Sequence, residues 1–164
     1  FLEPIALYSM RDLHADKDGG WMTTYPERGR TIPFGEVGVH GDGTDLAIVS
    51  FANGYFLSRQ AAQRLEAEGH RVRVIDLRWL SPLPEASLLA ALEGCARVLI
   101  VDETRRSGGV AEGLTALVVE RTALPVARVT ATDSFIATGP AYAATMPSAD
   151  GIHAAAKRMI EERA

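Results

Sequence analysis

Short apolar segments alternate with helical segments from Asp45 onward, and this alternation restricts the fold more than any other feature of the sequence. The segments "AIV" and "VLIV" are apolar throughout and rich in β-branched residues, which is typical of strands buried on both faces. Right-handed crossovers between parallel strands then place helices on both faces of the sheet. The sequence therefore predicts an α/β fold, a three-layer α/β/α domain with a mostly parallel open sheet. The predicted strands are residues 45–52, 71–76, 97–102 and 125–130, and the predicted helices are residues 57–69, 84–94, 109–122 and 148–164.

Residues 1–40 have a different character, because they are rich in Gly, Pro and charged residues and carry isolated aromatics. We predict that they form an extended arm that wraps a surface, followed by the α/β domain over residues 41–164. The aromatics are Trp21, Tyr25 and Phe34, and we expect them to fill shallow apolar pockets, including pockets of an adjoining domain. The chain begins with Phe-Leu in place of Met, which is typical of a piece of a longer protein.

Composition excludes several classes of partner. The net charge is −4 and the sequence has no long Lys/Arg cluster, so a nucleic-acid-binding function is not expected. No apolar run approaches the roughly 20 residues that span a bilayer, so no membrane is expected. The single cysteine, Cys95, is typical of a reducing compartment, and we expect a cytoplasmic protein. The four histidines have no metal-ligand spacing, so no metal site is predicted among them.

Residues 41–43 form a Gly-Asp-Gly, a tripeptide known from thiamine diphosphate enzymes, in which its Asp holds magnesium. In those enzymes the tripeptide ends a strand, and a metal-binding Asn follows well downstream. Here it precedes the predicted strand 45–52, and the nearest downstream Asn, Asn53, is too close and lies beyond that strand. Glycine supplies positive φ and Asp hydrogen-bonds within its own turn, so we predict a backbone reversal at Asp42 and no metal site.

Ligands of open α/β sheets bind outside the carboxyl ends of the strands, and the motifs that hold nucleotides there are absent. The sequence has neither G-x-G-x-x-G after its first predicted strand nor G-x-x-x-x-G-K-[ST]. One candidate anion loop precedes the helix 109–122, where backbone N–H groups could hold a carboxylate or a phosphate. The alternative is a flexible turn that lets the helix pack closely on the sheet. The candidate loop consists of Arg105, Ser107, Gly108 and Gly109.

Several stretches together resemble one family. "FLEPIALY", "GTDLAIVSFANG", "VIDLRWLSPLP", "VLIVDETRRSGGVAEGL" and "PVARVTATDSFIATGPA" are similar, in this order, to the C-terminal third of the E1 component of 2-oxo acid dehydrogenase complexes. More broadly, the same stretches resemble a transketolase C-terminal domain. The long arm and "DSFIATGPA" resemble the single-chain E1 proteins that fuse alpha and beta. One departure is Ala52, where the family commonly has Gly.

The resemblance implies that thiamine diphosphate and magnesium belong to the parent enzyme and lie between its upstream domains. No catalytic, cofactor-binding or metal-binding residue is then expected on this chain, which would be inactive alone. The resemblance also implies a role in assembly: packing against the upstream domains, a homodimer or an alpha2beta2 partner, and docking of the E2 acyltransferase. The residues that carry over as interdomain or partner contacts are Asp76, Arg78, Glu103 and, more weakly, Asp133.

Two other functions remain open from the residues. The chain could be a stand-alone α/β module that binds a small anion at Gly108 and Gly109. It could also be the C-terminal domain of a transketolase-type enzyme, which shares the fold and does not use E2. The pair Asp102-Glu103, at the end of a predicted strand, is compatible with a base or with an interface ion pair, and we favour the interface.

Overall fold

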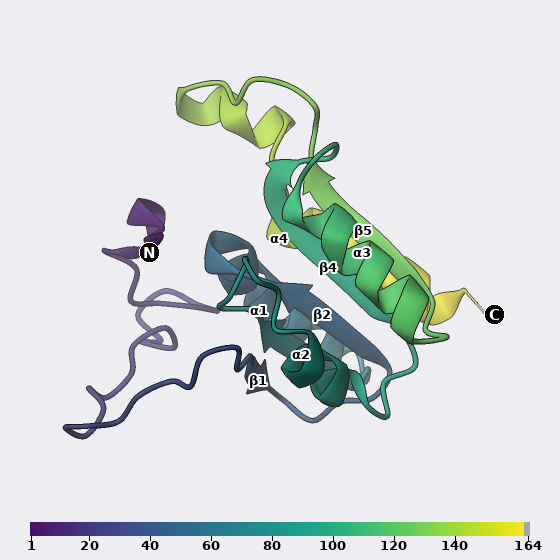
Figure 1. Cartoon of the computed structure of the whole chain (residues 1–164). Helices are drawn as coiled ribbons and strands as arrows, with labels where there is room; N and C mark the ends of the chain where they lie inside the picture. The colour runs from purple at the N-terminus through teal and green to yellow at the C-terminus, as the bar shows by residue number, and fades with distance from the viewer. Residues whose placement is uncertain (163–164) are drawn as a thin grey trace.

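A computed structural model describes residues 1–162, and its central feature is one sheet of five strands in the order β1-β3-β2-β4-β5 (Figure 1). Neighbouring strands from β3 to β5 are parallel, and β1 is antiparallel to β3. The strands are β1 (Gly38–His40), β2 (Leu46–Ser50), β3 (Val72–Asp76), β4 (Val98–Arg105) and β5 (Val126–Ala131). The helices are α1 (Ala52–Ala67), α2 (Glu85–Leu92), α3 (Val110–Arg121), α4 (Ala149–Glu161) and the short 3-10 helices η1 (Ile5–Leu7) and η2 (Gly139–Ala144).

Two apolar cores lie on opposite faces of the sheet, which confirms the predicted three-layer architecture. On one face, Ile48 and Leu99 pack with residues of α1 and α4, including the fully buried Leu65 and Ile152. On the other face, alternate residues of the same strands pack with α2 and α3. Side chains alternate between the faces of a strand, so strands that are apolar at every position fill both cores.

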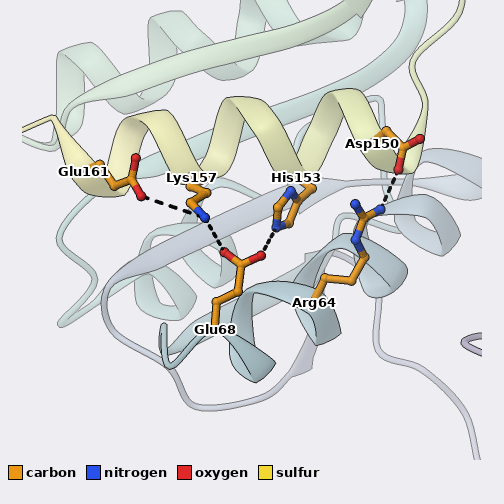
Figure 2. Close-up of polar contacts among 6 residues, drawn as sticks. All are labelled: Arg64, Glu68, Asp150, His153, Lys157 and Glu161. Atoms are coloured by element: carbon orange, nitrogen blue, oxygen red, sulfur yellow. Dashed lines mark hydrogen bonds and ion pairs between the residues drawn. The ribbon is translucent and has the colours of Figure 1, made fainter.

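Helix α4 is fastened to α1 by ion pairs as well as by the apolar core (Figure 2). Arg64 donates to Asp150 at 2.6 Å, and Glu68 accepts from His153 and Lys157, each at 2.9 Å. The hydrogen bond from Lys157 is the main reason that the pKa of Glu68 is lowered. Ion pairs on the surface contribute little to folding stability. We infer that these pairs fix the orientation of α4 and that the apolar core supplies most of the energy that holds it.

The structure differs from the predicted element boundaries most at β1 and at the start of α1. Strand β2 also ends at Ser50, two residues early, β4 continues to Arg105, three residues past its predicted end, and η1 and η2 were not predicted. Residues 38–40, predicted as part of the arm, form β1, so the sheet begins before residue 41. Helix α1 begins at Ala52, five residues before the predicted start at Leu57. Ser148 is the N-cap of α4 as predicted, and its side chain accepts a hydrogen bond from the N–H of Gly151. The end of the predicted helix, residues 163–164, lies outside the described residues.

The sharp turn from β2 into α1 explains the early helix start. Ala52 has a φ of +51°, in the left-handed region that side chains other than glycine rarely adopt. The left-handed conformation costs an L-residue roughly 1–2 kcal/mol, so the backbone at Ala52 is strained. The family that the sequence resembles commonly has Gly at this position.

Replacing Ala52 with Gly is expected to raise the free energy of unfolding by up to about 1 kcal/mol, because the relief of strain exceeds the added chain entropy of Gly. Ala52 is exposed, so no packing is lost. Chemical denaturation followed by circular dichroism measures the change. As a control, Ala154→Gly at an exposed position inside α4 should lower stability by about 1 kcal/mol. If both variants lost the same amount of stability, the backbone at Ala52 would not be strained.

Residues 41–43 cross the amino-terminal end of β3 on the way from β1 to β2. Gly41 has a φ of +75°, and a Cβ on it would come within 2.9 Å of the Val72 carbonyl oxygen. At Gly43 a Cβ would come within 2.2 Å of the Val72 nitrogen. Both glycines are therefore needed for close passage of two backbones. The carbonyl oxygen of Asp42 accepts a hydrogen bond from Arg73, at the edge of the sheet opposite the carboxyl ends.

Part of the predicted arm is a compact loop that docks on the domain itself. The carboxylate of Asp18 accepts hydrogen bonds from four backbone N–H groups between Leu13 and Gly20. Leu13 is buried, and its carbonyl oxygen accepts from Gln60 of α1. Trp21 packs edge-on against Phe56 of α1 at 5.0 Å between ring centroids. The loop thus covers α1 with apolar side chains from the arm.

The other two aromatics of the arm have different surroundings. Phe34 packs against Trp79, which follows β3, with ring centroids 4.5 Å apart. Tyr25 is 91% exposed. Trp21 is partly buried against this domain, whereas Phe34 stays 70% exposed in spite of its contact with Trp79. Within residues 1–162, no helix is long and apolar enough to cross a membrane.

Candidate interaction edge

The carboxyl ends of β2, β3, β4 and β5 meet at one edge of the sheet, and the predicted contact residues lie along it. Asp76 is the last residue of β3, which lies toward one side of the sheet, and Arg78 lies two residues beyond it. Glu103 lies near the end of β4, and Asp133 follows β5 on the other side. Strand β2 separates the two groups, so the sequence-predicted residues form two sites and not one.

The first site is an ion pair at the end of β3. The Nε of Arg78 lies 3.4 Å from a carboxylate oxygen of Asp76, and the two side chains are 33% and 28% exposed. Arg78 has a φ of +57°, and its guanidinium lies so close to Gly38 that a Cβ there would come within 2.5 Å of it. Burial raises the pKa of Asp76, and Arg78 partly offsets this. The half-buried pair is thus held in place, with both partners still reachable from solvent.

The second site contains Glu103, whose carboxylate is used inside the chain. Asn53 donates its amide N–H to a Glu103 carboxylate oxygen at 2.6 Å. The backbone N–H of Gly54, in the first turn of α1, also lowers the pKa of Glu103. Burial is the largest effect on Glu103 and raises its pKa, while the Asn53 amide and the Gly54 N–H lower it. Glu103 therefore ties β4 to the start of α1, where the helix dipole favours a carboxylate.

Asp102, the neighbour of Glu103, has a separate role that the sequence did not reveal. It is fully buried, and its two carboxylate oxygens accept from the N–H groups of Thr104 at 2.7 Å and Ala111 at 2.8 Å. Ala111 lies in the first turn of α3, so Asp102 caps that helix from outside it. The two acids thus serve two different helices and do not form a catalytic pair.

The candidate anion loop already holds a carboxylate of the same chain. Ser107 donates its backbone N–H and its hydroxyl to Asp133, at 2.8 Å and 2.7 Å. The Nε of Arg105 donates to the Ser107 carbonyl oxygen at 2.9 Å. A Cβ on Gly109 would come within 2.4 Å of the Thr104 hydroxyl oxygen, so this Gly allows the loop to close over β4. Ser107 thus hydrogen-bonds to a carboxylate of the same chain, and Gly109 allows close packing. Binding of an external anion by the loop stays a prediction.

The hydrogen bonds from Ser107 predict a lowered pKa for the Asp133 carboxyl group. The Ser107 hydroxyl and then its backbone N–H lower the pKa of Asp133. Because the folded pKa is lowered, the contribution to stability is present at neutral pH and is lost as pH falls through the folded pKa. Carboxyl carbon shifts followed by NMR should show that Ser107→Ala raises the pKa of Asp133. The control Ser134→Ala removes a neighbouring hydroxyl that bonds elsewhere, and an equal rise there would contradict the assignment.

A cavity of about 370 Å³ opens beside this loop, between the ends of β4 and β5. Its walls are partly apolar, with Val110, Ala131 and Ile136 contributing aliphatic surface. In residues 1–162 no group of three His, Cys, Asp or Glu residues could hold a metal ion. Cys95 is buried, away from this edge, and burial raises the pKa of its thiol.

Comparison with known proteins identifies the family of this chain. The family description "Transketolase, C-terminal domain" matches residues 35–152. The chain belongs to the transketolase C-terminal domain family. The match begins at residue 35, before β1, so the strand at residues 38–40 falls inside it. The predicted family resemblance is therefore confirmed, whereas the division of the chain at residue 40 stays a prediction.

Curated relatives of this transketolase C-terminal domain are beta subunits. The pyruvate dehydrogenase E1 component subunit beta of Bacillus subtilis is 31% identical over 140 residues, which cover 83% of this chain and 43% of the relative. The corresponding subunit of Staphylococcus aureus is 32% identical with the same coverage. The chain thus spans less than half the length of these relatives.

Solved structures agree with the fold of this transketolase C-terminal domain. A split-gene transketolase, solved as an inactive beta4 tetramer, has a TM-score of 0.71 at 25% identity over 79% of this chain and 43% of that one. The 2-oxoglutarate:ferredoxin oxidoreductase of Magnetococcus marinus has a TM-score of 0.58 at 22% identity, covering 77% of this chain and 20% of that one. The second likeness concerns the fold alone.

Proposed function

We propose that this chain is the C-terminal domain of the beta part of a 2-oxo acid dehydrogenase E1 component. In this role it supports dimerisation, packs against upstream domains and helps to dock E2, and it is inactive alone. The similarity to pyruvate dehydrogenase E1 beta subunits over 83% of the chain carries the proposal. The parent would oxidatively decarboxylate a 2-oxo acid and pass the acyl group to lipoyl-E2, with thiamine diphosphate and magnesium as its cofactors. We expect the enzyme in the cytoplasm.

The residues of this chain do not fit that cofactor, so no catalytic step is assigned to them. Asp42 lies at the amino-terminal end of the sheet, and its carbonyl oxygen is already bonded to Arg73. No metal-binding group of three acids, histidines or cysteines occurs among the described residues. The place of Asp42, opposite the carboxyl ends of the strands, is the observation that supports placing the cofactor in other domains of the parent enzyme. The chemistry would then be that of the cofactor, and this domain would position its neighbours.

The half-buried pair Asp76–Arg78 is the best candidate for a contact with an upstream domain or a second subunit. A planar guanidinium that is already oriented loses little entropy when it binds a further acceptor. Asp133 and the anion loop with Gly108 are weaker candidates, because Ser107 and Asp133 already satisfy each other. Glu103 contributes to this edge by fixing the start of α1 and not by reaching outward.

The test uses the full-length enzyme that contains this chain. We expect thiamine diphosphate-dependent acylation of lipoyl-E2 from a 2-oxo acid, and we expect Arg78→Ala to weaken subunit assembly in analytical ultracentrifugation. The matched control is Arg71→Ala, which also breaks an Arg–Asp pair, with Asp45, at the amino-terminal edge. Equal effects of the two variants, or none from Arg78→Ala, would overturn the assigned contact.

A transketolase-type parent is the second candidate, and the likeness to the split-gene transketolase favours it. Ketol transfer by the full-length enzyme, without acylation of E2, would identify that class. A stand-alone anion-binding module would instead bind phosphate or pyruvate tightly in a calorimetric titration of this chain alone. We expect no such binding, since the Ser107 donors are occupied by Asp133.

A further inference from the structure

The cavity between the ends of β4 and β5 has the size and the position of a small-ligand site. Its volume is about 370 Å³, near the lower end of the roughly 300–1,000 Å³ that is typical of ligand pockets. It lies at the carboxyl edge of the sheet, where ligands of open α/β sheets bind. This volume therefore suits a small metabolite better than a dinucleotide.

Two side chains of opposite charge line this cavity, and both come from the end of β4. Arg105 is exposed, and its guanidinium forms no ion pair with a carboxylate within residues 1–162. Its Nε donates to the Ser107 carbonyl oxygen at 2.9 Å, which leaves the other N–H groups of the fork for a ligand. Asn53 donates to one carboxylate oxygen of Glu103, and an ionised carboxylate accepts several hydrogen bonds. The cavity thus offers one cation and one anion that can bind a ligand.

Aliphatic side chains form another part of the cavity wall. Val110 begins α3, Ala131 ends β5, and Ile136 lies in the segment between β5 and α4. Ile136 is 58% exposed, so a ligand that covers it removes apolar surface from water, which favours binding. The ligand should therefore carry a small aliphatic group beside its polar groups.

An aliphatic α-amino acid combines these features in one small molecule. Its carboxylate matches the planar fork of a guanidinium, and its ammonium group matches a carboxylate. The amino-terminal end of α3, with Gly109 as its N-cap, lies at the same cavity and favours a carboxylate there. A ligand with a single charge would leave either Arg105 or Glu103 without a partner, and a charge that loses water without gaining a partner weakens binding. The zwitterion satisfies both residues.

We propose that the cavity between the ends of β4 and β5 binds a free aliphatic α-amino acid as its zwitterion. Arg105 binds the carboxylate, Glu103 binds the ammonium group, and Ile136 covers the aliphatic side chain. The inference goes beyond the proposed function, which assigns no small ligand to this domain. It also does not depend on which 2-oxo acid the parent enzyme uses.

Isothermal titration calorimetry of the full-length enzyme that contains this chain tests the proposal, with leucine as the probe. We expect leucine to bind with a Kd of about 1 mM or below. Two analogues test the two charges, since 4-methylpentanoate lacks the ammonium group and 3-methylbutylamine lacks the carboxylate. Each should bind at least about tenfold more weakly, because each loses one charged hydrogen-bonded pair. Heat that persists in the double variant Glu103→Gln, Arg105→Met belongs to other sites and is subtracted. No binding of leucine, or equal binding of either analogue, would overturn the proposal.

Single variants assign each charge of the ligand to its residue. Arg105→Met should weaken the binding of leucine at least about tenfold and leave that of 3-methylbutylamine unchanged, because the amine has no carboxylate to lose a partner. Glu103→Gln keeps an acceptor oxygen for Asn53 and should weaken leucine while leaving 4-methylpentanoate unchanged.

The matched control is Arg106→Met, which removes the neighbouring exposed guanidinium that does not line the cavity. A loss of leucine binding in this control equal to that in Arg105→Met would overturn the assignment. Circular dichroism checks that the variants fold. The proposed E1 function could survive a negative result, since acylation of E2 is measured separately in the same enzyme.

Discussion

Replacing Gly43 with Ala is expected to lower the free energy of unfolding by about 3 kcal/mol, near the upper end of overpacking effects. The added Cβ would come within 2.2 Å of the Val72 nitrogen and 2.3 Å of the Arg71 carbonyl carbon. Both are backbone atoms at the start of β3, so no side chain can turn aside. Either the crossing between β1 and β2 or the start of β3 must shift.

Urea denaturation measures this loss, and the chain offers a matched control. Gly113 lies inside α3, where a Cβ would make only ordinary contact with Leu83, at 3.6 Å. Gly113→Ala should therefore raise stability by roughly 0.5–1 kcal/mol, because Ala is the better helix former. A gain at both positions would show that the backbones at Gly43 have room to separate.

Replacing Asp102 with Ala is expected to lower the free energy of unfolding by about 3 kcal/mol. The variant leaves the N–H groups of Thr104 and Ala111 without the acceptor that the carboxylate supplies, and Ala111 is buried. An unsatisfied buried donor costs about 1–3 kcal/mol, and the lost cap of α3 about 1 kcal/mol.

Asp102→Asn is the matched variant, because it keeps the shape and one acceptor oxygen. We expect it to lose roughly half as much as Asp102→Ala, since only one of the two N–H groups loses its acceptor. Amide hydrogen exchange should speed up at Ala111 in the Ala variant more than in the Asn variant. Equal stability of Asp102→Ala and the wild type would mean that water replaces both hydrogen bonds.

The strands and the layers could be predicted from the sequence, because uniformly apolar strands have few alternatives to a parallel sheet between helices. The start of α1 could not. The pair Asn53-Gly54 signals a turn, and no side chain of the sequence neighbours caps the helix. The side chain that Asn53 of the first turn binds is Glu103, which comes from another strand. Strand β1 was missed because three residues in a Gly-rich stretch carry no periodicity, and pairing with β3 alone defines them.

The candidate site was predicted less completely than the fold. The predicted position of Asp76 and Arg78 at the carboxyl edge of the sheet was correct, because Asp76 ends an easily recognised strand and Arg78 lies two residues beyond it. The sequence could not show that Asp133 reaches Ser107, a contact across 26 positions that two loops bring together. It also could not separate Asp102 from Glu103, since neighbours in a strand point to opposite sides and meet different helices. A buried acid a few residues before Gly-Gly and a helix is the signal that could have identified the cap.

Both tryptophans of the chain lie where the N-terminal segment meets the folded domain. Trp21 lies in the predicted arm and contacts Phe56 of α1, and Trp79 follows β3 and contacts Phe34 of the predicted arm. The intrinsic fluorescence of the two tryptophans should therefore change when the predicted arm leaves the rest of the chain. Far-ultraviolet dichroism reports the helices instead, so a mismatch between the two signals during unfolding would measure how independently the arm detaches.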